Sequence, residues 1–345
     1  MKTRKDNLAQ LCEEGYVVEP GQKFVVDDFR PGDALGVARL YYRVYGDMFP
    51  IDHVYDPQEL ARINAGDDLY QAVGRTDKGD IVGLYALFRN PPGRKIMEAG
   101  SWIVHPDYRT TSLGLRLARK IHNKPPEHLG LDVISGQCVC DHLTTQKLGK
   151  VVGACTCALE IEPMPPRPIS EGGAYGRISL LDQFCILHDR PHDIFLPTRY
   201  ADALRAICEG EGLTRTFVED VPPQSDTVAS TLVIEDASLA KLTVEAVGVD
   251  FARHLAEMER AKPDMHVYQL VLPLWRPGCS LAVEAARARG YFFGGLLPQW
   301  YDRDGLLLQK VAGTPDFDKI KLFSPQGQGL LDIIRADWQS LHAGG

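Results

Sequence analysis

Apolar residues recur at two spacings along the first half of the chain, and these spacings predict its elements. Residues 34–47 carry apolar side chains at helical spacing after Asp33, which suits a helix N-cap, and Asp56 followed by Pro57 favours a second helix start. Short apolar runs between turn residues predict strands. The expected order is a strand at 23–28, helices at 34–47 and 57–64, strands at 69–75, 81–88 and 96–104, a helix at 112–122, a strand at 131–139, a helix at 142–150 with Asp141 as its cap, and a strand at 152–161.

The second half shows a similar order of patterns without a close sequence repeat. Its expected elements are a strand at 177–187, a helix at 197–209, paired strands at 226–234 and 239–249, a helix at 251–261, a strand at 267–272, a helix at 279–289, strands at 291–297 and 306–311, and a helix at 329–341. Alternating strands and helices favour a mixed β-sheet with helices packed on its faces. The predicted fold class is therefore α/β, with a mixed sheet in each of two tandem halves.

A proline- and glycine-rich segment separates the halves. Residues 162–176 read EPMPPRPISEGGAYG, which can continue neither a helix nor a strand ladder. A chain of 345 residues also exceeds the size at which one core usually keeps growing. The predicted domains are residues 1–162 and 177–345, joined by a linker at 163–176.

Composition narrows the classes of partner. Hydrophobic residues make up 44% of the chain and charged residues 24%, as in ordinary globular proteins, and the formal net charge is −8. An acidic chain argues against nucleic acid as the main partner. No apolar run is long enough to cross a bilayer, and the charged N-terminus does not resemble a secretory signal. The expected location is the cytoplasm, without a membrane partner.

Eight cysteines include two C-x-C pairs, Cys138/Cys140 and Cys155/Cys157. Residues i and i+2 of a strand point to one face, so such pairs fit small apolar side chains entering a core. A zinc or iron–sulfur site is the alternative, although metal sites more often show C-x2-C spacing. The core interpretation is favoured, and no metal is expected.

The segment 98–121, EAGSWIVHPDYRTTSLGLRLARKI, carries the clearest chemistry. A strand ends at Val104, a polar turn follows, and a helix begins near Ser112. Backbone N–H groups at a helix start lack partners and face the positive end of the helix dipole, so they can bind phosphate. Arg109, Arg116, Arg119 and Lys120 add positive charge near this turn.

These residues resemble the pyrophosphate loop of the GNAT acetyltransferase superfamily. That loop reads Q/R-x-x-G-x-G/A after a strand that often ends V-x-P-x-Y-R. This chain gives Val104-His105-Pro106-Asp107-Tyr108-Arg109 and then Thr110-Thr111-Ser112-Leu113-Gly114, with Ser112 at the first glycine position. The resemblance covers roughly residues 20–162.

The resemblance implies that acetyl-CoA or another acyl-CoA is the co-substrate of the first half. It implies cofactor contacts at Trp102, Ile103, Val104, Arg109, Thr110, Thr111, Ser112, Leu113, Gly114 and Leu115. Glu98 matches the position of a general base, with a solvated strand carboxylate as the alternative. The family often has a tyrosine on the helix at 142–150, which is missing here, and His142 is the candidate substitute, although a helix cap or core histidine is the favoured interpretation.

The second half resembles the end of a GNAT domain at Arg289-Gly290-Tyr291-Phe292, but it lacks the phosphate loop. Asp250 stands at the start of the helix at 251–261, where a carboxylate would repel pyrophosphate. This half is expected to bind no CoA and to form part of an acceptor cleft. Five aromatic residues could line that cleft, although core or interface packing is the favoured interpretation for them: Tyr291, Phe292, Phe293, Trp300 and Tyr301.

The expected function is transfer of an acyl group from acyl-CoA to an amine on a small molecule or peptide. Two alternatives stay open. One is a CoA-binding sensor or scaffold without catalysis, and the other is a transferase that takes its acyl group from a carrier-protein thioester.

Overall fold

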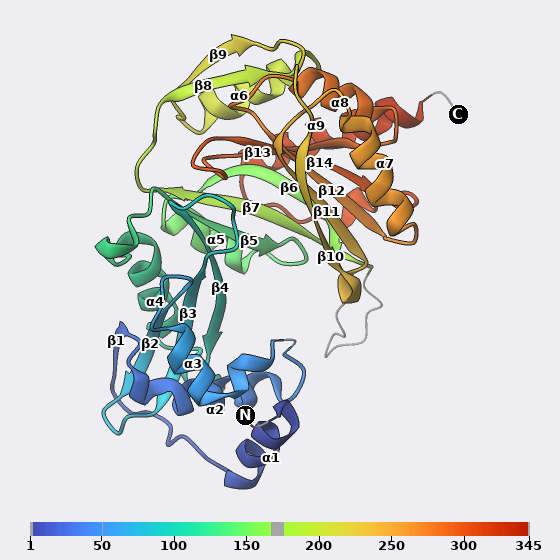
Figure 1. Ribbon diagram of the computed structural model, residues 1–345. Helices are drawn as coiled ribbons and strands as arrows, with labels where there is room; N and C mark the ends of the chain where they lie inside the picture. The colour runs from blue at the N-terminus through green and yellow to red at the C-terminus, as the bar shows by residue number, and fades with distance from the viewer. Residues whose placement is uncertain (1–2, 50, 167–175, 344–345) are drawn as a thin grey trace. The chain divides into compact units, whose positions relative to one another are not determined.

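The computed structural model describes residues 3–49, 51–166 and 176–343 (Figure 1). The chain forms two compact units, residues 1–91 with 97–134 and residues 92–96 with 135–345. They are called unit 1 and unit 2 below. Most of the predicted linker lies outside the described residues, so its role as a domain boundary stays a prediction. The strands on either side of it, however, are hydrogen-bonded to each other.

Unit 1 contains an antiparallel sheet in the order β1-β2-β3-β4. Its strands are β1 (Phe24–Asp28), β2 (Leu69–Thr76), β3 (Ile81–Phe88) and β4 (Ile96–Val104), and its α-helices are α1 (Arg4–Glu14), α2 (Ala34–Tyr45), α3 (Pro57–Ile63) and α4 (Leu113–Asn123). Short 3-10 turns are η1 (Pro31–Asp33), η2 (Asp52–Tyr55), η3 (Pro106–Tyr108) and η4 (Glu127–Leu129).

Two helix layers cover the two faces of this sheet. Helices α2 and α3 pack their apolar residues against Val73, Leu84 and Ile103 on one face. Helix α4 covers the other face, where the Leu113 side chain occupies the space left free by Gly74 and Gly83. A methyl group on Gly74 would come within 2.5 Å of the Leu113 side chain, so small residues set how deeply α4 lies.

Unit 2 contains most of the β-structure. Its strands are β5 (Val133–Val139), β6 (Cys155–Met164), β7 (Ile178–Ile186), β8 (His192–Leu196), β9 (Arg215–Glu219), β10 (Val228–Ile234), β11 (Leu239–Ala246), β12 (Val267–Pro273), β13 (Phe292–Leu297) and β14 (Gly305–Val311). Its helices are α5 (Thr144–Val151), α6 (Ala201–Gly210), α7 (Phe251–Ala261), α8 (Cys279–Arg287) and α9 (Pro325–His342), with 3-10 turns η5 (Thr198–Tyr200), η6 (Glu235–Ala237) and η7 (Phe317–Lys319).

The large sheet of unit 2 repeats one motif about its centre. Its order is β5-β7-β6-β13-β14-β12-β11-β10, and β8 and β9 form a separate parallel pair. Each of β5 and β12 is followed by a helix and then a hairpin, β6–β7 or β13–β14. The hairpins meet where β6 pairs antiparallel with β13, at Ala158 and Gly295. The first copy includes β7, whereas the sequence analysis assigns the strand at 177–187 to the second half.

The junction of the hairpins depends on two residues. Gly295 has a φ of +132°, and a methyl group there would lie 2.4 Å from the Cys157 carbonyl oxygen. The buried Gln309 side chain accepts a hydrogen bond from the Ile161 N–H (2.7 Å) and donates one to the Leu159 carbonyl (2.9 Å). The Gln309 side chain therefore joins β14 to β6 next to the short pairing of β6 with β13 at Ala158 and Gly295.

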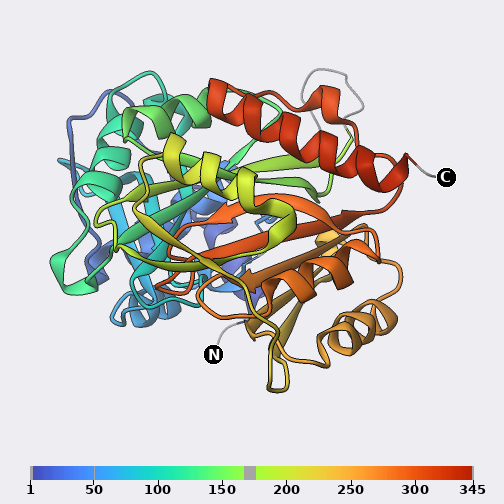
Figure 2. The ribbon, with the colours of Figure 1, turned by 90° about the horizontal axis from the view of Figure 1, so that it is seen from above.

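The predicted mixed α/β class is confirmed, with α9 on one face of the unit 2 sheet and α7 and α8 on the other (Figure 2). The helix and strand predictions agree with the structure to within a few residues, while α1, β8 and β9 were not predicted. Asp33 occupies the N-cap position of α2 as predicted, but its side chain pairs with Arg75 and makes no capping bond. The predicted cap at Asp141 is wrong, because α5 begins after Leu143. No helix in the described ranges is long and apolar enough to span a membrane.

Candidate functional site

Strand β4 of unit 1 is interrupted by a β-bulge at Ser101 and Trp102, where the predicted cofactor contacts begin. Leu84 pairs with Ile103 and Ala86 with Gly100, so Ser101 and Trp102 together face Tyr85. Ser101 has a φ of +53°, which is unusual for a residue with a side chain. Bulges re-aim side chains and interrupt pairing, and they are common beside active sites.

Trp102 connects this bulge to helix α4. Its ring stacks on Tyr85 with centroids 5.8 Å apart, and a methyl group on Gly114 would lie 3.1 Å from its Cζ2 atom. The Tyr85 hydroxyl oxygen in turn lies 3.2 Å from Nε2 of the buried His122. The glycine that matches the family motif therefore admits an indole ring in this chain. The Trp102 Nε1 atom is buried and has no hydrogen-bond partner among the described residues.

The turn between β4 and α4 is open to solvent. Arg109, Thr110, Thr111 and Ser112 are all exposed, and α4 begins at Leu113. Ser112 occupies the N-cap position, but its side chain makes no capping bond. The hydroxyl of Thr111 accepts the hydrogen bond from the Leu113 N–H instead (3.2 Å). The first-turn N–H groups after Leu113 remain available to an anion by the general geometry of helix starts.

Of the basic residues near the turn, Arg109 stays beside it, whereas Arg116 and Lys120 contact strand β1. Arg109 donates from Nε to the Val104 carbonyl (3.3 Å), which keeps its guanidinium at the end of β4. Arg116 contacts the Phe24 carbonyl and lies over the Phe24 ring, and Lys120 pairs with Asp28 (2.7 Å). Arg109 is thus the best placed of the predicted cations.

The other predicted contacts divide between core and surface. The side chain of Ile103 is 1% exposed and lies in the α2–α3 core, and Leu113 is fully buried against the sheet. Neither side chain is therefore accessible to a ligand. Leu115 and Val104 keep part of their side chains accessible. Glu98 lies at the start of β4, opposite Phe88, and accepts a hydrogen bond from the Asn90 amide (3.2 Å).

His142 lies in unit 2 at the start of α5. Its Nδ1 accepts a hydrogen bond from the Thr144 N–H (3.3 Å), which is the helix-capping role that the sequence favours. Its imidazole is half exposed, so Nε2 faces solvent or Asp141, 3.9 Å away. Capping and a chemical role at Nε2 are compatible.

The C-x-C cysteines are core thiols. Cys157 is fully buried and Cys140 nearly so. Burial raises the pKa of Cys138 to about 11 and that of Cys155 to about 12, so both are protonated thiols near neutral pH. A metal ligand or nucleophile needs the opposite shift. No group of three or more His, Cys, Asp or Glu side chains suited to a metal occurs within residues 3–49, 51–166 and 176–343.

In the second half, the Tyr301 side chain lies between the parallel strands β11 and β12 at the point where they separate. Parallel strands β11 and β12 pair only as far as Thr243 and Val271. Beyond this point the Tyr301 hydroxyl lies 3.0 Å from the Val244 carbonyl and 3.3 Å from the Val271 carbonyl. Burial raises its pKa, so it remains a neutral donor. The side chain fills the space that opens as the strands separate.

The turn between β11 and α7 is also closely packed. A methyl group on Gly248 would lie 2.2 Å from the Thr227 backbone nitrogen, and Val249 donates to the Ser225 carbonyl (3.0 Å). Asp250 accepts a hydrogen bond from the Thr227 N–H (2.8 Å), which is the largest cause of its lowered pKa. Residues 225–227 and an ionised carboxylate therefore fill the space before the start of α7. That this half binds no CoA stays a prediction.

The aromatic residues of this half are core residues rather than an open lining. Tyr291, Phe292 and Phe293 are fully buried, and Trp300 is half-buried. Tyr301 contacts Trp275, with ring centroids 4.6 Å apart. The core interpretation holds for this group.

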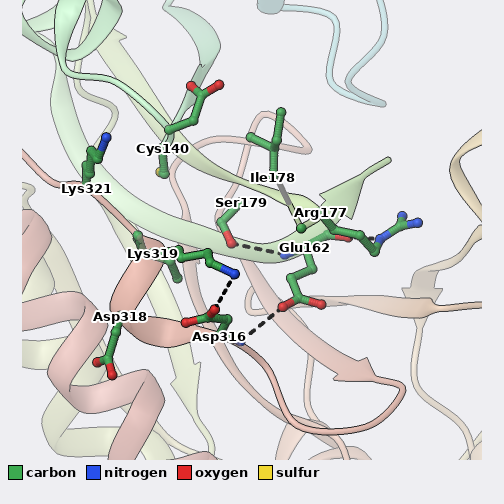
Figure 3. Close-up of a pocket in the computed structure, with 12 residues that line it drawn as sticks. Cys140, Glu162, Arg177, Ile178, Ser179, Asp316, Asp318, Lys319 and Lys321 are labelled. Carbon is green, nitrogen blue, oxygen red and sulfur yellow. Dashed lines mark hydrogen bonds and ion pairs between the residues drawn. The ribbon is translucent and has the colours of Figure 1, made fainter. Parts of the chain in front are cut away.

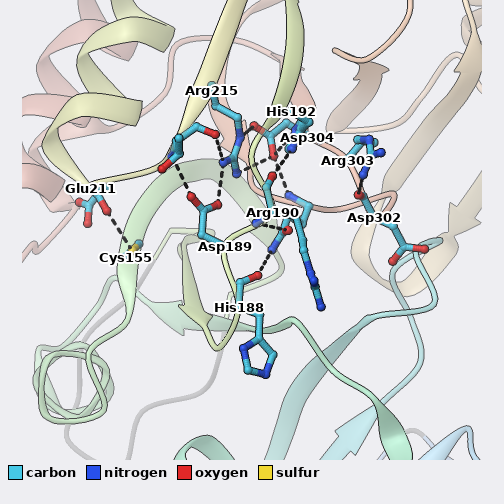
Figure 4. Close-up of polar contacts among 12 residues, drawn as sticks. Cys155, His188, Asp189, Arg190, His192, Glu211, Arg215, Asp302, Arg303 and Asp304 are labelled. Carbon is cyan, nitrogen blue, oxygen red and sulfur yellow. Dashed lines mark hydrogen bonds and ion pairs between the residues drawn. The ribbon is translucent and has the colours of Figure 1, made fainter.

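Two polar clusters of unit 2 were not predicted. Figure 4 shows Asp304, Arg215 and Asp189 in a chain of ion pairs between β9 and the β13–β14 loop, with Arg215 and Asp304 unexposed. A cavity of about 340 Å³ lies beside Glu162, whose carboxylate pairs with His266 (2.7 Å) and accepts a hydrogen bond from the Asp316 N–H (3.1 Å). Figure 3 shows Glu162 and Asp316 among the residues that line this cavity. Sequence patterns gave no signal for either, because their members are far apart in the chain.

Three solved structures illustrate what the chain is similar to. The spermidine/spermine N-acetyltransferase SpeG from Vibrio cholerae in complex with manganese ions is 15% identical, with a TM-score of 0.37, and the match covers 48% of this chain and 93% of that one. An N-acetyltransferase from Staphylococcus aureus Mu50 is 10% identical, with a TM-score of 0.39 and coverage of 48% and 99%. An acetyltransferase, yncA, from Salmonella typhimurium with its cofactor acetyl-CoA is 15% identical, with a TM-score of 0.39 and coverage of 49% and 96%.

Other similar structures are described as GNAT-family acetyltransferases and also cover about half of this chain. The solved structures that match are thus those the sequence resemblance implies. No protein-family model matches the chain, and no curated protein matches it. TM-scores this low carry no conclusion about substrate or mechanism, which rest on the residues themselves.

Proposed function

We propose that the chain is an acyl-CoA-dependent N-acyltransferase whose donor site is formed by β4, η3 and the start of α4. The observation that carries the proposal is the sequence of a bulge at Ser101, an exposed turn at 109–112 and a helix start at Leu113 within one continuous segment. A bulge frees strand N–H groups from pairing, and a helix start supplies N–H groups for a phosphate. One segment thus offers N–H donors both for the acyl thioester and for the pyrophosphate of acyl-CoA.

The proposed roles follow from position. Arg109 and the N–H groups of Gly114 and Leu115 bind the pyrophosphate, while the backbone of Trp102, Ile103 and Val104 holds the pantetheine arm. Donors preorganised at the bulge would stabilise the oxyanion that forms on the thioester carbonyl oxygen when the amine attacks its carbon. No covalent enzyme intermediate is needed, because the thioester is already activated and positioning supplies much of the rate.

Glu98 is the proposed general base that removes a proton from the attacking amine. It lies on the same strand as the bulge and is partly accessible. His142 is the proposed donor of a proton to the leaving thiolate through Nε2, while Nδ1 keeps its capping bond. The acceptor is proposed to be an amine on a small molecule or peptide.

Calorimetry with CoA and acetyl-CoA tests the donor site. We expect saturable binding below about 1 mM ligand, the upper end of usual Michaelis constants. Arg109→Glu should weaken binding at least about tenfold, since a charge-assisted bond becomes a repulsion. Arg62→Glu, an equal charge change at an exposed residue of α3, is the matched control and should bind normally. Absence of binding to the native chain would refute the donor site.

Turnover separates the enzyme from its alternatives. With a panel of amines, Glu98→Gln should lower kcat about 10²–10⁴-fold and leave CoA binding intact, as expected for loss of a general base. Glu127→Gln at the exposed turn η4 is the control. Binding of CoA without transfer to any amine would favour a sensor or scaffold. Transfer only from an acylated carrier protein would identify that thioester as the donor.

A further inference from the structure

A separate cavity lies on the α2 side of unit 1. It has a volume of about 140 Å³, and its lining includes Tyr16, Arg39, Arg43, Asp80 and His105. An engineered cavity of similar size holds one benzene molecule, so this one suits a ligand of a few heavy atoms. All its lining residues belong to unit 1, and none is a proposed contact of acyl-CoA.

Positive charge is concentrated on one wall of this cavity. Arg39 and Arg43 lie one helical turn apart on α2, an arrangement of like charges that weakens an isolated helix. The Arg39 guanidinium lies over the Tyr16 ring, 3.9 Å from its centroid. Arg43 is exposed, so its guanidinium is accessible to a bound anion.

Asp80 is the one carboxylate among the described residues that line the cavity, and its oxygens already accept hydrogen bonds. Asp80 accepts hydrogen bonds from the Tyr16 hydroxyl and from the Gln22 amide (2.8 Å). Burial alone would raise its pKa, but these bonds outweigh burial and the pKa is lowered. Asp80 therefore holds the Tyr16–Gln22 segment in place as a carboxylate and offers little to a cation in the cavity.

His105 provides a neutral donor in the same cavity. It is 3% exposed, and its Nδ1 accepts a hydrogen bond from the Asp107 N–H (3.4 Å). Burial lowers its pKa, and Arg43 and Arg109 lower it further against the opposing effect of Asp107. The neutral ring then carries its proton on Nε2, which makes that atom a hydrogen-bond donor.

We propose that this cavity binds a small oxyanion, a carboxylate or a phosphate group, through Arg43, Arg39 and His105. Guanidinium groups pair with both anions through two parallel hydrogen bonds, and the neutral histidine adds a donor without a charge to desolvate. The site is independent of the proposed acyl transfer, because it uses the opposite face of the sheet from α4.

Protection from an arginine-selective dicarbonyl reagent, mapped by mass spectrometry, tests the site in the full chain. Inorganic phosphate and acetate are the two probes, with ionic strength held constant by chloride. We expect one or both to slow modification of Arg43 several-fold while Arg62, exposed on α3, reacts at an unchanged rate. Protection by phosphate alone would assign a phosphate site, and protection by acetate alone a carboxylate site. Equal reactivity of Arg43 with and without both anions would overturn the proposal.

Variants provide a second measurement. Arg43→Gln should weaken calorimetric binding of the protecting anion about tenfold or more, the loss expected for one charged contact. Arg43→Lys should retain part of the affinity, and Arg62→Gln all of it. Unchanged affinity in a folded Arg43→Gln protein would also reject the site. Because neither readout uses CoA, failure here leaves the proposed function untouched.

Discussion

Asp304 and Arg215 form a fully buried ion pair in unit 2, with bonds of 2.6 and 3.2 Å and no exposed surface on either side chain. Asp304→Asn leaves the buried Arg215 guanidinium paired with Asp189, so the charge keeps one described ion-pair partner. The substitution should therefore lower the free energy of unfolding by up to about 3 kcal/mol in urea titrations at pH 7, the lower end of the cost of leaving a buried charge with no partner. Asp52→Asn, which removes an exposed pair with Arg4, should cost less than about 1 kcal/mol.

The same pair predicts an acid dependence of stability. Burial favours a raised pKa for Asp304, but hydrogen bonds from His192 and Arg215 outweigh it and hold the pKa below its ordinary value of 3.8. A lowered folded pKa means that stability is present above the unfolded value and lost as pH falls through the folded one. The difference in unfolding free energy between the native chain and Asp304→Asn should thus shrink below about pH 4. A constant difference between pH 7 and pH 3 would contradict this account.

Gly295 should be nearly irreplaceable. Gly295→Ala places a methyl group 2.4 Å from the Cys157 carbonyl oxygen at a φ of +132°, so the β6–β13 junction must separate. We expect a loss above about 3 kcal/mol or insoluble protein. Gly290→Ala is the matched control, because Gly290 also has a positive φ (+91°) but meets only the end of Lys310 at 4.0 Å. It should cost about 1 kcal/mol.

Tyr301 is expected to act in stability and not in binding. Tyr301→Phe removes the donor shared by the Val244 and Val271 carbonyls and should cost about 1–2 kcal/mol, and Tyr301→Ala should cost about 3–5 kcal/mol. Neither variant should bind CoA in the second half, because residues 225–227 still fill the space before α7. Calorimetric stoichiometry checks this, and one more CoA per chain in Tyr301→Ala than in the native protein would show that the tyrosine alone blocks a site there.

Alkylation should distinguish the cysteines. Cys12 is exposed, while Cys138 and Cys155 have pKa values raised by burial to about 11 and about 12. Because the thiolate is the reactive form, iodoacetamide at pH 8 should label Cys12 first and the other two only after denaturation. Rapid native labelling of Cys138, read by peptide mass spectrometry, would indicate that β5 opens locally.

Local patterns in the sequence predict most helices and strands because these segments are amphipathic or bounded by turn residues. The helix at 251–261 was predicted with the bounds that α7 has in the structure. By contrast, α1 has no continuous apolar stripe, and β8 and β9 are short strands held by the Asp304–Arg215 pair, far away in the chain. Contacts of this length leave no local periodicity.

The candidate site shows the same division. The positions of Arg109 and Gly114 follow from a local motif, and the structure places both on one strand–turn–helix segment. The sequence could not reveal that Thr111 replaces Ser112 as the cap, or that Trp102 occupies the space at Gly114. The cavity at Arg43 and the tyrosine between β11 and β12 likewise depend on residues that only folding brings together.

Strand β7 limits how the chain can be shortened. It lies between β5 and β6 in the sheet although it follows both in the chain, and it pairs with β6 from Cys155 to Met164. A fragment that stops at residue 162 would leave β5 and β6 without the strand that joins them, and would expose two unpaired edges prone to aggregation. A first-half fragment that folds alone therefore has to extend through Ile186, so the proline-rich segment is retained inside it.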